Sequence, residues 1–487
     1  MNDEGEREMS LKRVRIVVAL SVLAGAQSGA HAVTRELANV PTFNLTFGQS
    51  VLNQLTFDTY RTPYDDLQTR PYNLLFSGIA RPSNIDTWPG QQGGYARYVD
   101  ALIGNNGAAN VDNNADAISG SMVRRESGTV AWGLSAAVLA GQIDSNSSAG
   151  TSTFRDGNDL KALDLRGAVA IQLGTSSVLG AGLRAVLARH DNTDANFDPG
   201  TGGVNSAENF EQQGLTADVG YRRFINDKSS WELRGVLGYG NSTQDIHSDN
   251  VDVTGAVTDR FVSTNYDIND LSFAVDGSYN RLRAEGLGET EYRGGLSFSQ
   301  RKLGNTDLAY SETLGVRTPD LTLLSQDPVT TISGFGSARS IFQAGETEMF
   351  VGARLGYDKA SGSSVIDAAG TTSSEKIDDS QLALGLTLGL RQPLLRDKLR
   401  IVVSGHGDIL DAKTATTYDT GSASARSTLT AAQYAIGLES VFANVTLDLA
   451  WLAGEEAAVV PIPIGIPSGA RRTVQLDKLV LSAAVSW

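Results

Sequence analysis

The sequence contains no cysteine and only 4 histidines in 487 residues. The absence of cysteine excludes disulfide bonds, thiol catalysis and an N-terminal cysteine for lipid attachment. No part of the chain approaches the roughly 18 consecutive apolar residues of a transmembrane helix, so none is expected. The formal net charge of −15 argues against binding to nucleic acid, whose phosphates require a basic protein surface.

Motifs for catalysis are also missing. The sequence has no HExxH, GxSxG or phosphate-binding-loop motif. Ser404, His406 and Asp408 alternate along one face of an expected strand, where a nucleophile and its base can be imagined. The backbones of such residues stand about 6.5–7 Å apart along a strand, and their side chains rarely form a hydrogen-bonded chain. We therefore expect neither enzymatic activity nor a cofactor.

The chain is rich in alternating apolar and polar segments from about residue 93 to its end. The segment 381–391 is typical, because its apolar face is a row of leucines: Leu382, Leu384, Leu386, Leu388 and Leu390. Successive side chains of a strand leave opposite faces, so this pattern predicts strands with one apolar face. A spanning barrel exposes only alternate residues to lipid, which is compatible with the mean hydropathy of −0.16.

The N-terminal part differs from the rest. Residues 1–32 are expected to be a secretory signal, with basic residues before an apolar run at 16–26 and cleavage near Ala32. Residues 33–92 hold five of the 12 prolines and alternate poorly. Because proline removes a donor from a sheet, we expect a periplasmic extension or a plug here, with a disordered leader as the alternative. The barrel itself is expected over residues 93–487.

Connections between the alternating segments are short and long in turn. Short connections lie near 174–176 and 226–228, and the expected long loops are 142–159, 190–213, 240–270, 301–330, 359–380, 411–431 and 453–471. This alternation is typical of membrane barrels, which have short periplasmic turns and long outer loops. The sequence predicts an all-β fold, a transmembrane antiparallel up-and-down β-barrel of about 16 strands, with 14 as the alternative. The segments 93–103, 117–126 and 331–342 are the weaker strands in that count.

The last strand carries the most specific motif. Leu479, Leu481, Val485 and Trp487 share one face, and the chain ends on an aromatic residue. In this respect the chain resembles the outer-membrane β-barrel proteins of Gram-negative bacteria. In that family the insertion machinery recognises a closing strand that ends in Phe or Trp. The resemblance implies an outer-membrane location, with lipid and lipopolysaccharide around the barrel. Whether the protein forms a homo-oligomer stays open.

Aromatic residues agree with a membrane-spanning band. Trp231 and Tyr239 share a face and lie about 26 Å apart along their strand, which projects to about 19 Å at a tilt near 45°. This distance is close to the height of a lipid-facing band with an aromatic girdle at each rim. Ordinary aromatic residues of a β-core are the alternative interpretation.

Charged residues occupy the faces opposite the leucines. Such a face cannot lie in a dry core, whereas in a water-filled lumen it is tolerated and affects ion selectivity. The expected pore-lining residues carry both signs, so the preferred ion stays open: Asp164, Arg166, Arg184, Asp218, Arg222, Glu232, Arg234, Asp276, Arg293, Glu348, Arg354, Asp358, Arg391, Arg400, Asp408, Glu439, Asp448 and Lys478.

Two Asn/Asp clusters fall in expected outer loops. Asp194, Asn196 and Asp198 alternate as the first ligands of a calcium loop do, but glycine stands at position 7 and Asn205 at position 12. A solvated acidic loop is the preferred interpretation, and calcium binding is the weaker one.

These features favour a channel for passive passage of small solutes through a charge-lined lumen. A second hypothesis is similarity to the long-chain fatty-acid channel family, which has 14 strands and an N-terminal plug. The region 33–92 and the apolar loop 459–467 suit that family, whereas the charged lumen and the missing Asn-Pro-Ala motif do not. A third is a non-conducting barrel that acts as an adhesin or scaffold through its outer loops.

Overall fold

The computed structural model describes residues 109–485, except 127–128, 150–151, 201, 227, 255–256, 283–287, 305–306, 314–315, 369–370, 396–397, 419–420, 443–444 and 460–470. The expected signal (1–32), extension (33–92) and first strand (93–103), as well as Trp487, lie outside these residues. Most of the apolar loop 459–467 does too.

The described residues form a single antiparallel sheet of sixteen strands. They are β1 (Ala109–Arg125), β2 (Val130–Ala149), β3 (Ser152–Leu173), β4 (Ser177–Asp198), β5 (Gly202–Asn226), β6 (Ser229–Val251), β7 (Val257–Leu282), β8 (Gly288–Leu303), β9 (Asp307–Thr313), β10 (Val316–Ala344), β11 (Thr347–Ala368), β12 (Thr371–Pro393), β13 (Leu399–Tyr418), β14 (Gly421–Phe442), β15 (Val445–Val459) and β16 (Arg471–Val485).

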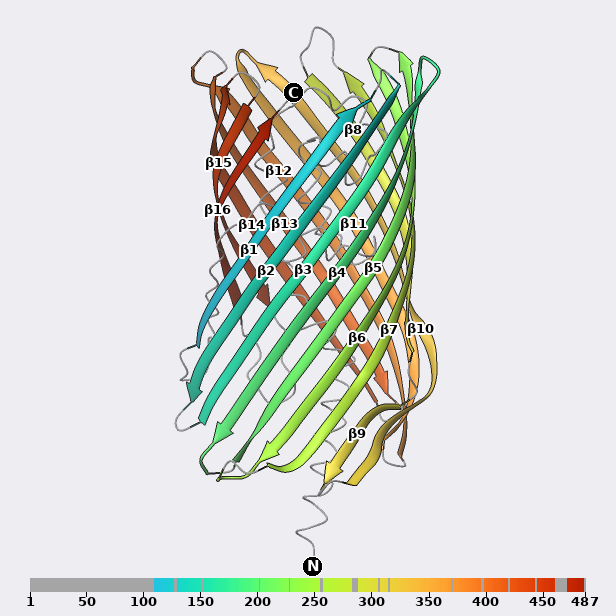
Figure 1. Ribbon diagram of the computed structural model, residues 1–487, viewed down its shortest axis with the longest axis vertical. Helices are drawn as coiled ribbons and strands as arrows, with labels where there is room; N and C mark the ends of the chain where they lie inside the picture. Colours follow the sequence, from blue (N-terminus) through green and yellow to red (C-terminus); the bar gives the residue numbers. More distant parts are fainter. Residues whose placement is uncertain are drawn as a thin grey trace, which may run out of the picture.

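Except at β9, neighbours in sequence are neighbours in the sheet, which curves round into a tall barrel of strongly tilted strands (Figure 1). This is the up-and-down β-barrel fold that the alternation predicted. None of the described residues forms a helix long and apolar enough to cross a membrane. We call the end with the turns at 174–176 and 345–346, at the top of Figure 1, the turn end, and the opposite end the far end.

Strand β9 was not expected. It pairs with β7 and β10, the same two strands that flank β8, so β8 and β9 are two pieces of one interrupted strand position. The sixteen strands therefore occupy fifteen positions across the sheet. The total equals the predicted count, but its members differ, because the predicted strand 93–103 lies outside the described residues.

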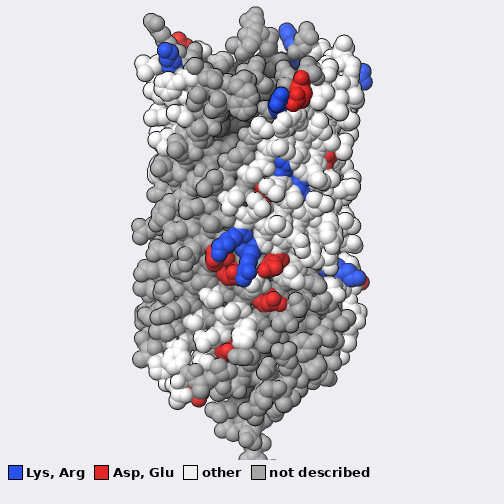
Figure 2. All heavy atoms as spheres, viewed as in Figure 1, with Lys and Arg blue, Asp and Glu red and all other residues white. Residues whose placement is uncertain are grey.

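The two faces of each strand follow the alternation of the sequence. On β4, Leu179, Leu183 and Leu187 are exposed, whereas Val178 and Val186, each directly before one of these leucines, are buried. The same holds for four leucines of β12, which are 44–62% exposed: Leu382, Leu384, Leu386 and Leu388. Figure 2 shows one side of this outer face, where charged atoms are few. Exposed leucine beside buried charge is the inverse of a water-soluble protein and fits a wall between lipid and lumen.

A small apolar cluster lies on the inner face near the turn end. Ala131, Ala168, Ala170 and Val178 are buried there, with the partly buried Phe224 packed against them. These side chains are short, so neighbouring strands β2, β3 and β4 pack without a large core. Most of the other buried residues on the inner face are polar or charged.

The expected aromatic positions fall at two levels of the outer face. Near the turn end the rings of Tyr221 and Trp231 lie 5.3 Å apart, and Trp231 is opposite Tyr279 in the sheet. Further along β6, the hydroxyl of Tyr239 donates to Asn269 Oδ1 (3.2 Å), where leucine gives way to polar residues. Trp231 and Tyr239 thus mark the two limits of an apolar band on one strand.

The prediction of long outer loops is wrong for the six segments from 142–159 to 411–431, whereas most of the seventh, 453–471, lies outside the described residues. The segments 142–159 and 190–213 continue as paired strand, so that β3 begins at Ser152 and β5 at Gly202. Beyond the apolar band polar residues occupy both faces of the sheet, so the alternation disappears. The backbone ladder continues, because it does not depend on side-chain polarity. The strands are consequently up to 29 residues long, against the about 9–11 that a bilayer requires.

Candidate functional site

The predicted pore-lining charges lie on the buried inner face wherever the structure describes their side chains. Fifteen of the eighteen are described, all of them buried or half-buried. The side chains of Asp408, Asp448 and Lys478 are not described, although their positions on β13, β15 and β16 are. We call the described charged residues of this face the inner wall. Their role as the lining of an open pore remains a prediction.

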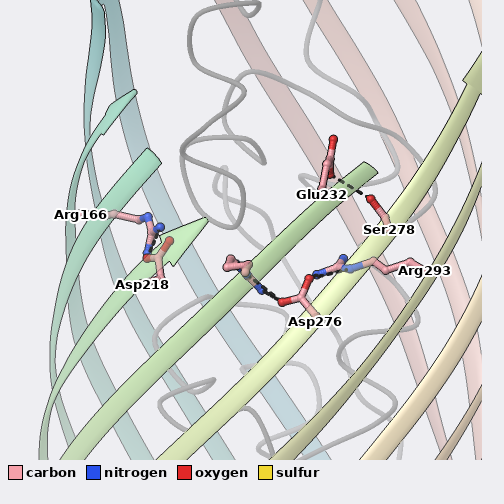
Figure 3. Close-up of polar contacts among 7 residues, drawn as sticks. Arg166, Asp218, Glu232, Asp276, Ser278 and Arg293 are labelled. Atoms are coloured by element: carbon pink, nitrogen blue, oxygen red, sulfur yellow. Dashed lines mark hydrogen bonds and ion pairs between the residues drawn. The ribbon is translucent and has the colours of Figure 1, made fainter. Parts of the chain in front are cut away.

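Asp276 of β7 is the centre of the inner wall (Figure 3). Arg234 of β6 donates from Nε to Asp276 Oδ2 at 2.8 Å, and Arg293 of β8 donates from Nη2 to Oδ1 at 2.9 Å. The three side chains are only 2–9% exposed. One carboxylate therefore joins three strands and neutralises part of the charge of two buried guanidinium groups.

A second ion pair crosses an entire strand. Arg166 of β3 donates from Nη2 to Asp218 Oδ1 of β5 at 2.5 Å, over the intervening strand β4 (Figure 3). Gly182 is the residue of β4 that lies beneath this pair. A Cβ on Gly182 would stand 2.5 Å from Arg166 Nη2 and 2.7 Å from Asp218 Oδ1. The missing side chain at Gly182 is therefore what allows the pair to form.

The neighbouring contacts extend the inner wall in both directions along the sheet. On one side, Arg184 donates two hydrogen bonds of 2.9 Å to the carboxylate of Asp164. On the other, Ser278 donates to Glu232 Oε2 at 2.9 Å, and Arg222 approaches Glu232 Oε1 at 3.5 Å. Each contact joins neighbouring strands across the lumenal surface.

Strands β11 to β14 carry a separate chain of charges. Glu348 of β11 accepts a hydrogen bond of 3.1 Å from Arg391 of β12. Arg391 also approaches Glu439 of β14 at 3.6 Å, and Arg400 of β13 donates to Glu439 at 2.7 Å. Glu439 is 1% exposed and has a cation on either side. Four predicted residues are thus brought together in one group.

Sequence reasoning missed several members of the inner wall. Arg339 of β10 pairs with Glu291 of β8 at 2.5 Å, and Arg301 pairs with Asp270 at 2.9 Å. The spacing of Glu291 and Arg293, two residues apart on a strand, was a signal for the first pair. Arg339 was missed because it lies in the weaker segment 331–342. Asp270 and Arg301 were missed because each lies at the edge of an expected loop.

Phe335 was missed for a different reason. Its ring lies 4.0 Å from the guanidinium carbon of Arg354 and 5.5 Å from that of Arg293, so an aromatic ring separates two cations. Gly295 faces this ring, where a Cβ would stand 2.6 Å from Phe335 Cε1. An aromatic residue on a polar inner face interrupts the alternation of apolar and polar residues. No pattern in the sequence therefore indicated Phe335.

The arrangement as a whole is nearly neutral and closely paired. Arginines and carboxylates of the described inner wall occur in about equal numbers, and most of their ion pairs join different strands. Removing one partner of such a buried pair is costly, because the other charge is then uncompensated. The wall can hold a polar lumen in a fixed shape, but it presents no large excess of one sign.

The acidic cluster expected in an outer loop, with calcium binding as the weaker interpretation, lies on a strand instead. Asp194, Asn196 and Asp198 lie on β4, opposite residues of β3 and β5 in the sheet, and not in a loop. A calcium loop must wrap its oxygen ligands around the ion, which an extended strand cannot do. Within the part of the chain that the structure describes, no group of three His, Asp or Glu residues is placed to hold a metal.

Charged residues of the outer face gather beyond the apolar band. Figure 2 shows one such group, with scattered charged residues elsewhere on the described surface. The exposed pairs of β3 to β5 are Lys161 with Asp159 at 2.9 Å, and Arg189 with Asp191 at 3.0 Å and Glu211 at 3.6 Å. The hydrogen bond with Asp191 raises the pKa of Arg189 above its ordinary value. These pairs mark the level at which the outer face leaves the apolar band.

No protein-family model matches the chain, and no curated protein matches it. Among solved structures, the toluene transporter TodX of Pseudomonas putida is similar over 89% of this chain and 97% of its own, with 11% identity and a TM-score of 0.36. FpvA of P. aeruginosa, solved with bound pyoverdines, is 11% identical over 80% of this chain and 72% of its own, with a TM-score of 0.35. The transport unit of the Escherichia coli autotransporter AIDA-I is 9% identical over 87% and 100%, with a TM-score of 0.27. Similarity this low carries no functional argument, so function is argued from the geometry.

Proposed function

We propose that the protein is an outer-membrane β-barrel through which small polar solutes diffuse. The observation that carries this proposal is the inversion of the two faces. Leu183 and Leu237 are 54% and 60% exposed, whereas Arg166 and Asp276 on neighbouring strands are at most 5% exposed. A barrel with an apolar outside and a polar inside is stable when lipid surrounds it and water enters its lumen.

The predicted signal at 1–32 and the closing strand support the outer membrane as the location. The apolar band would contact lipid, and the charged pairs around Lys161 and Arg189 would lie at the level of lipopolysaccharide headgroups. The insertion machinery would read the strand that ends at Trp487. No enzymatic step forms part of this proposal.

The balance of charge on the inner wall supports weak ion selectivity. Rings of one charge sign produce strong selectivity in pores. Here the carboxylate of Asp276 lies between two arginines and Glu439 lies between two more, so neither sign dominates. We expect a reversal potential near zero in a potassium chloride gradient.

Conductance of the purified protein in planar bilayers tests the proposal. Folded protein, identified by a gel mobility that changes on heating, should give discrete current steps that scale with salt concentration. The same preparation after heat denaturation is the control. A folded, membrane-inserted barrel that stays silent would reject diffusion and favour the surface scaffold. Uptake of hydrophobic compounds without ion current would favour the fatty-acid-channel alternative.

A further inference from the structure

A groove lies on the outer face of β1 to β4, among the exposed leucines of the apolar band. It has a volume of about 720 Å³, and its apolar lining surrounds Gly167: Met122, Leu134, Ala136, Leu165, Leu183 and Ala185. The registers of the sheet explain the recess, because they set small residues beside large ones. Gly167 lies between Leu134 and Leu183, and in the next row Leu165 lies between two alanines. The groove can therefore hold a flexible apolar chain.

Two cations lie beyond the groove on the same two strands. Lys161 of β3 and Arg189 of β4 are directly opposite each other on the outer face, with side chains 66% and 52% exposed. They stand four residues from Leu165 and Ala185, about 13 Å along the strands toward the far end. The outer face thus presents an apolar recess and, further out, two adjacent positive charges.

Carboxylates accompany these cations but leave them accessible. Asp159 and Asp191 lie two residues further toward the far end and are also directly opposite each other. Asp159 is 2.9 Å from Lys161 and Asp191 is 3.0 Å from Arg189, which Glu211 of β5 also approaches at 3.6 Å. These contacts hold the two cations at the edge of the apolar band. More than half of each cationic side chain remains open to an anion from outside.

We propose that the groove and the two cations together bind one molecule of lipopolysaccharide. An acyl chain occupies the groove, and a lipid phosphate accepts hydrogen bonds from Lys161 and Arg189, since both residue types bind phosphate well. A phosphorylated, acylated lipid has the same order, with its phosphate outermost and its acyl chains beneath. Lipopolysaccharide is the source because the proposed function places these cations at the level of its headgroups, and the inference rests on that location.

Binding of fluorescently labelled lipopolysaccharide to the folded, detergent-solubilised barrel tests the two cations. Each cation near an anionic lipid headgroup contributes about fivefold to binding, so Lys161→Gln/Arg189→Gln should weaken it at least about tenfold. Lys359→Gln/Lys376→Gln is the matched control, because it removes two exposed lysines of β11 and β12 that are far from the groove in the sheet. The control should bind as wild type does. Dephosphorylated lipopolysaccharide should bind the wild type as weakly as the intact lipid binds Lys161→Gln/Arg189→Gln.

A second pair of variants tests the groove. Gly167→Leu fills the recess, whereas Gly235→Leu adds the same side chain to the outer face of β6, where a Cβ meets nothing within 4 Å. Each methylene that loses its apolar contact weakens binding about fourfold, so Gly167→Leu should weaken it by at least that factor. Gly235→Leu should leave binding unchanged.

Several results would overturn the proposal. They are wild-type binding by folded Lys161→Gln/Arg189→Gln or folded Gly167→Leu, an equal loss in the matched controls, and equally strong binding of phosphatidylglycerol. The two cations are exposed, so their replacement should preserve the heat-modifiable mobility of the folded barrel. If Gly167→Leu does not fold, the cation variant and the dephosphorylated lipid decide.

The proposed function fails by different measurements. Val253→Cys, in the far-end turn between β6 and β7, introduces the only cysteine of the chain. It should react with a membrane-impermeant maleimide on intact cells, and reaction only after the outer membrane is opened would refute the proposed location. A folded barrel that binds lipopolysaccharide but conducts no current would reject diffusion and leave the lipid site intact.

Discussion

The substitution Asp276→Asn removes the carboxylate that joins Arg234 to Arg293. Asparagine preserves the size of the side chain, but two buried guanidinium groups then face each other without an anion. Asp276 accepts hydrogen bonds of 2.8–3.2 Å from both arginines, and the three side chains are at most 9% exposed. Breaking a buried pair by removing one partner costs about 3–5 kcal/mol, so we expect the free energy of unfolding to fall by this amount.

The assay is guanidinium unfolding of the detergent-solubilised barrel, followed by tryptophan fluorescence. Asp159→Asn is the matched control, because Asp159 also pairs with a cation at 2.9 Å but is 46% exposed. An exposed pair of this kind contributes about 0–1 kcal/mol. Adding Arg293→Gln to Asp276→Asn should restore part of the loss, since it removes one of the two repelling charges. If Asp276→Asn costs no more than Asp159→Asn, lumenal water already solvates the arginines and the inner wall is not a buried network.

Three further substitutions test other parts of the structure. Gly182→Ala should displace the Arg166–Asp218 pair and lower the unfolding free energy by about 1–3 kcal/mol, whereas Gly405→Ala, where a Cβ meets nothing within 4 Å, should change it little. Gly389→Ala should lower the unfolding free energy at least as much as Gly182→Ala, because the new Cβ overlaps the ring of Phe350. An additional Phe350→Leu should recover part of this loss. A neutral Gly389→Ala would contradict the packing of Gly389 against Phe350. Leu183→Arg, in the middle of the apolar band, should cost about 2–4 kcal/mol in lipid vesicles. Thr193→Arg, on the same face of β4 as Leu183, should cost less than about 1 kcal/mol. If Leu183→Arg and Thr193→Arg cost the same, lipid does not contact this face of β4 at Leu183.

Alternation of side chains was sufficient to predict the fold. Leucine at every second position of β12 and small or polar residues between them determined which face meets lipid, and the structure has that same division. The outer parts of the strands could not be predicted in this way. Between 190 and 213, for example, neither face needs to be apolar, so a paired strand and a solvated loop have the same composition.

The sequence predicted which residues belong to the candidate site, but not which of them form ion pairs. Alternation places Arg166 and Asp218 on the inner face, yet nothing in the sequence shows that they meet across β4. That contact depends on the register of three strands and on the missing side chain of Gly182. Phe335 could not be found, because its role is set by two arginines that come from different strands.

If the barrel is the proposed channel, the length of its strands affects how fast solute can cross. A strand of 22 residues, such as β3, is about 73 Å long and rises about 50 Å at a tilt near 45°, whereas the apolar band of a bacterial barrel is about 25 Å tall. The electrical resistance of a water-filled tube grows in proportion to its length. At equal cross-section, this barrel should therefore conduct about half as much current as one that ends at the lipid surface.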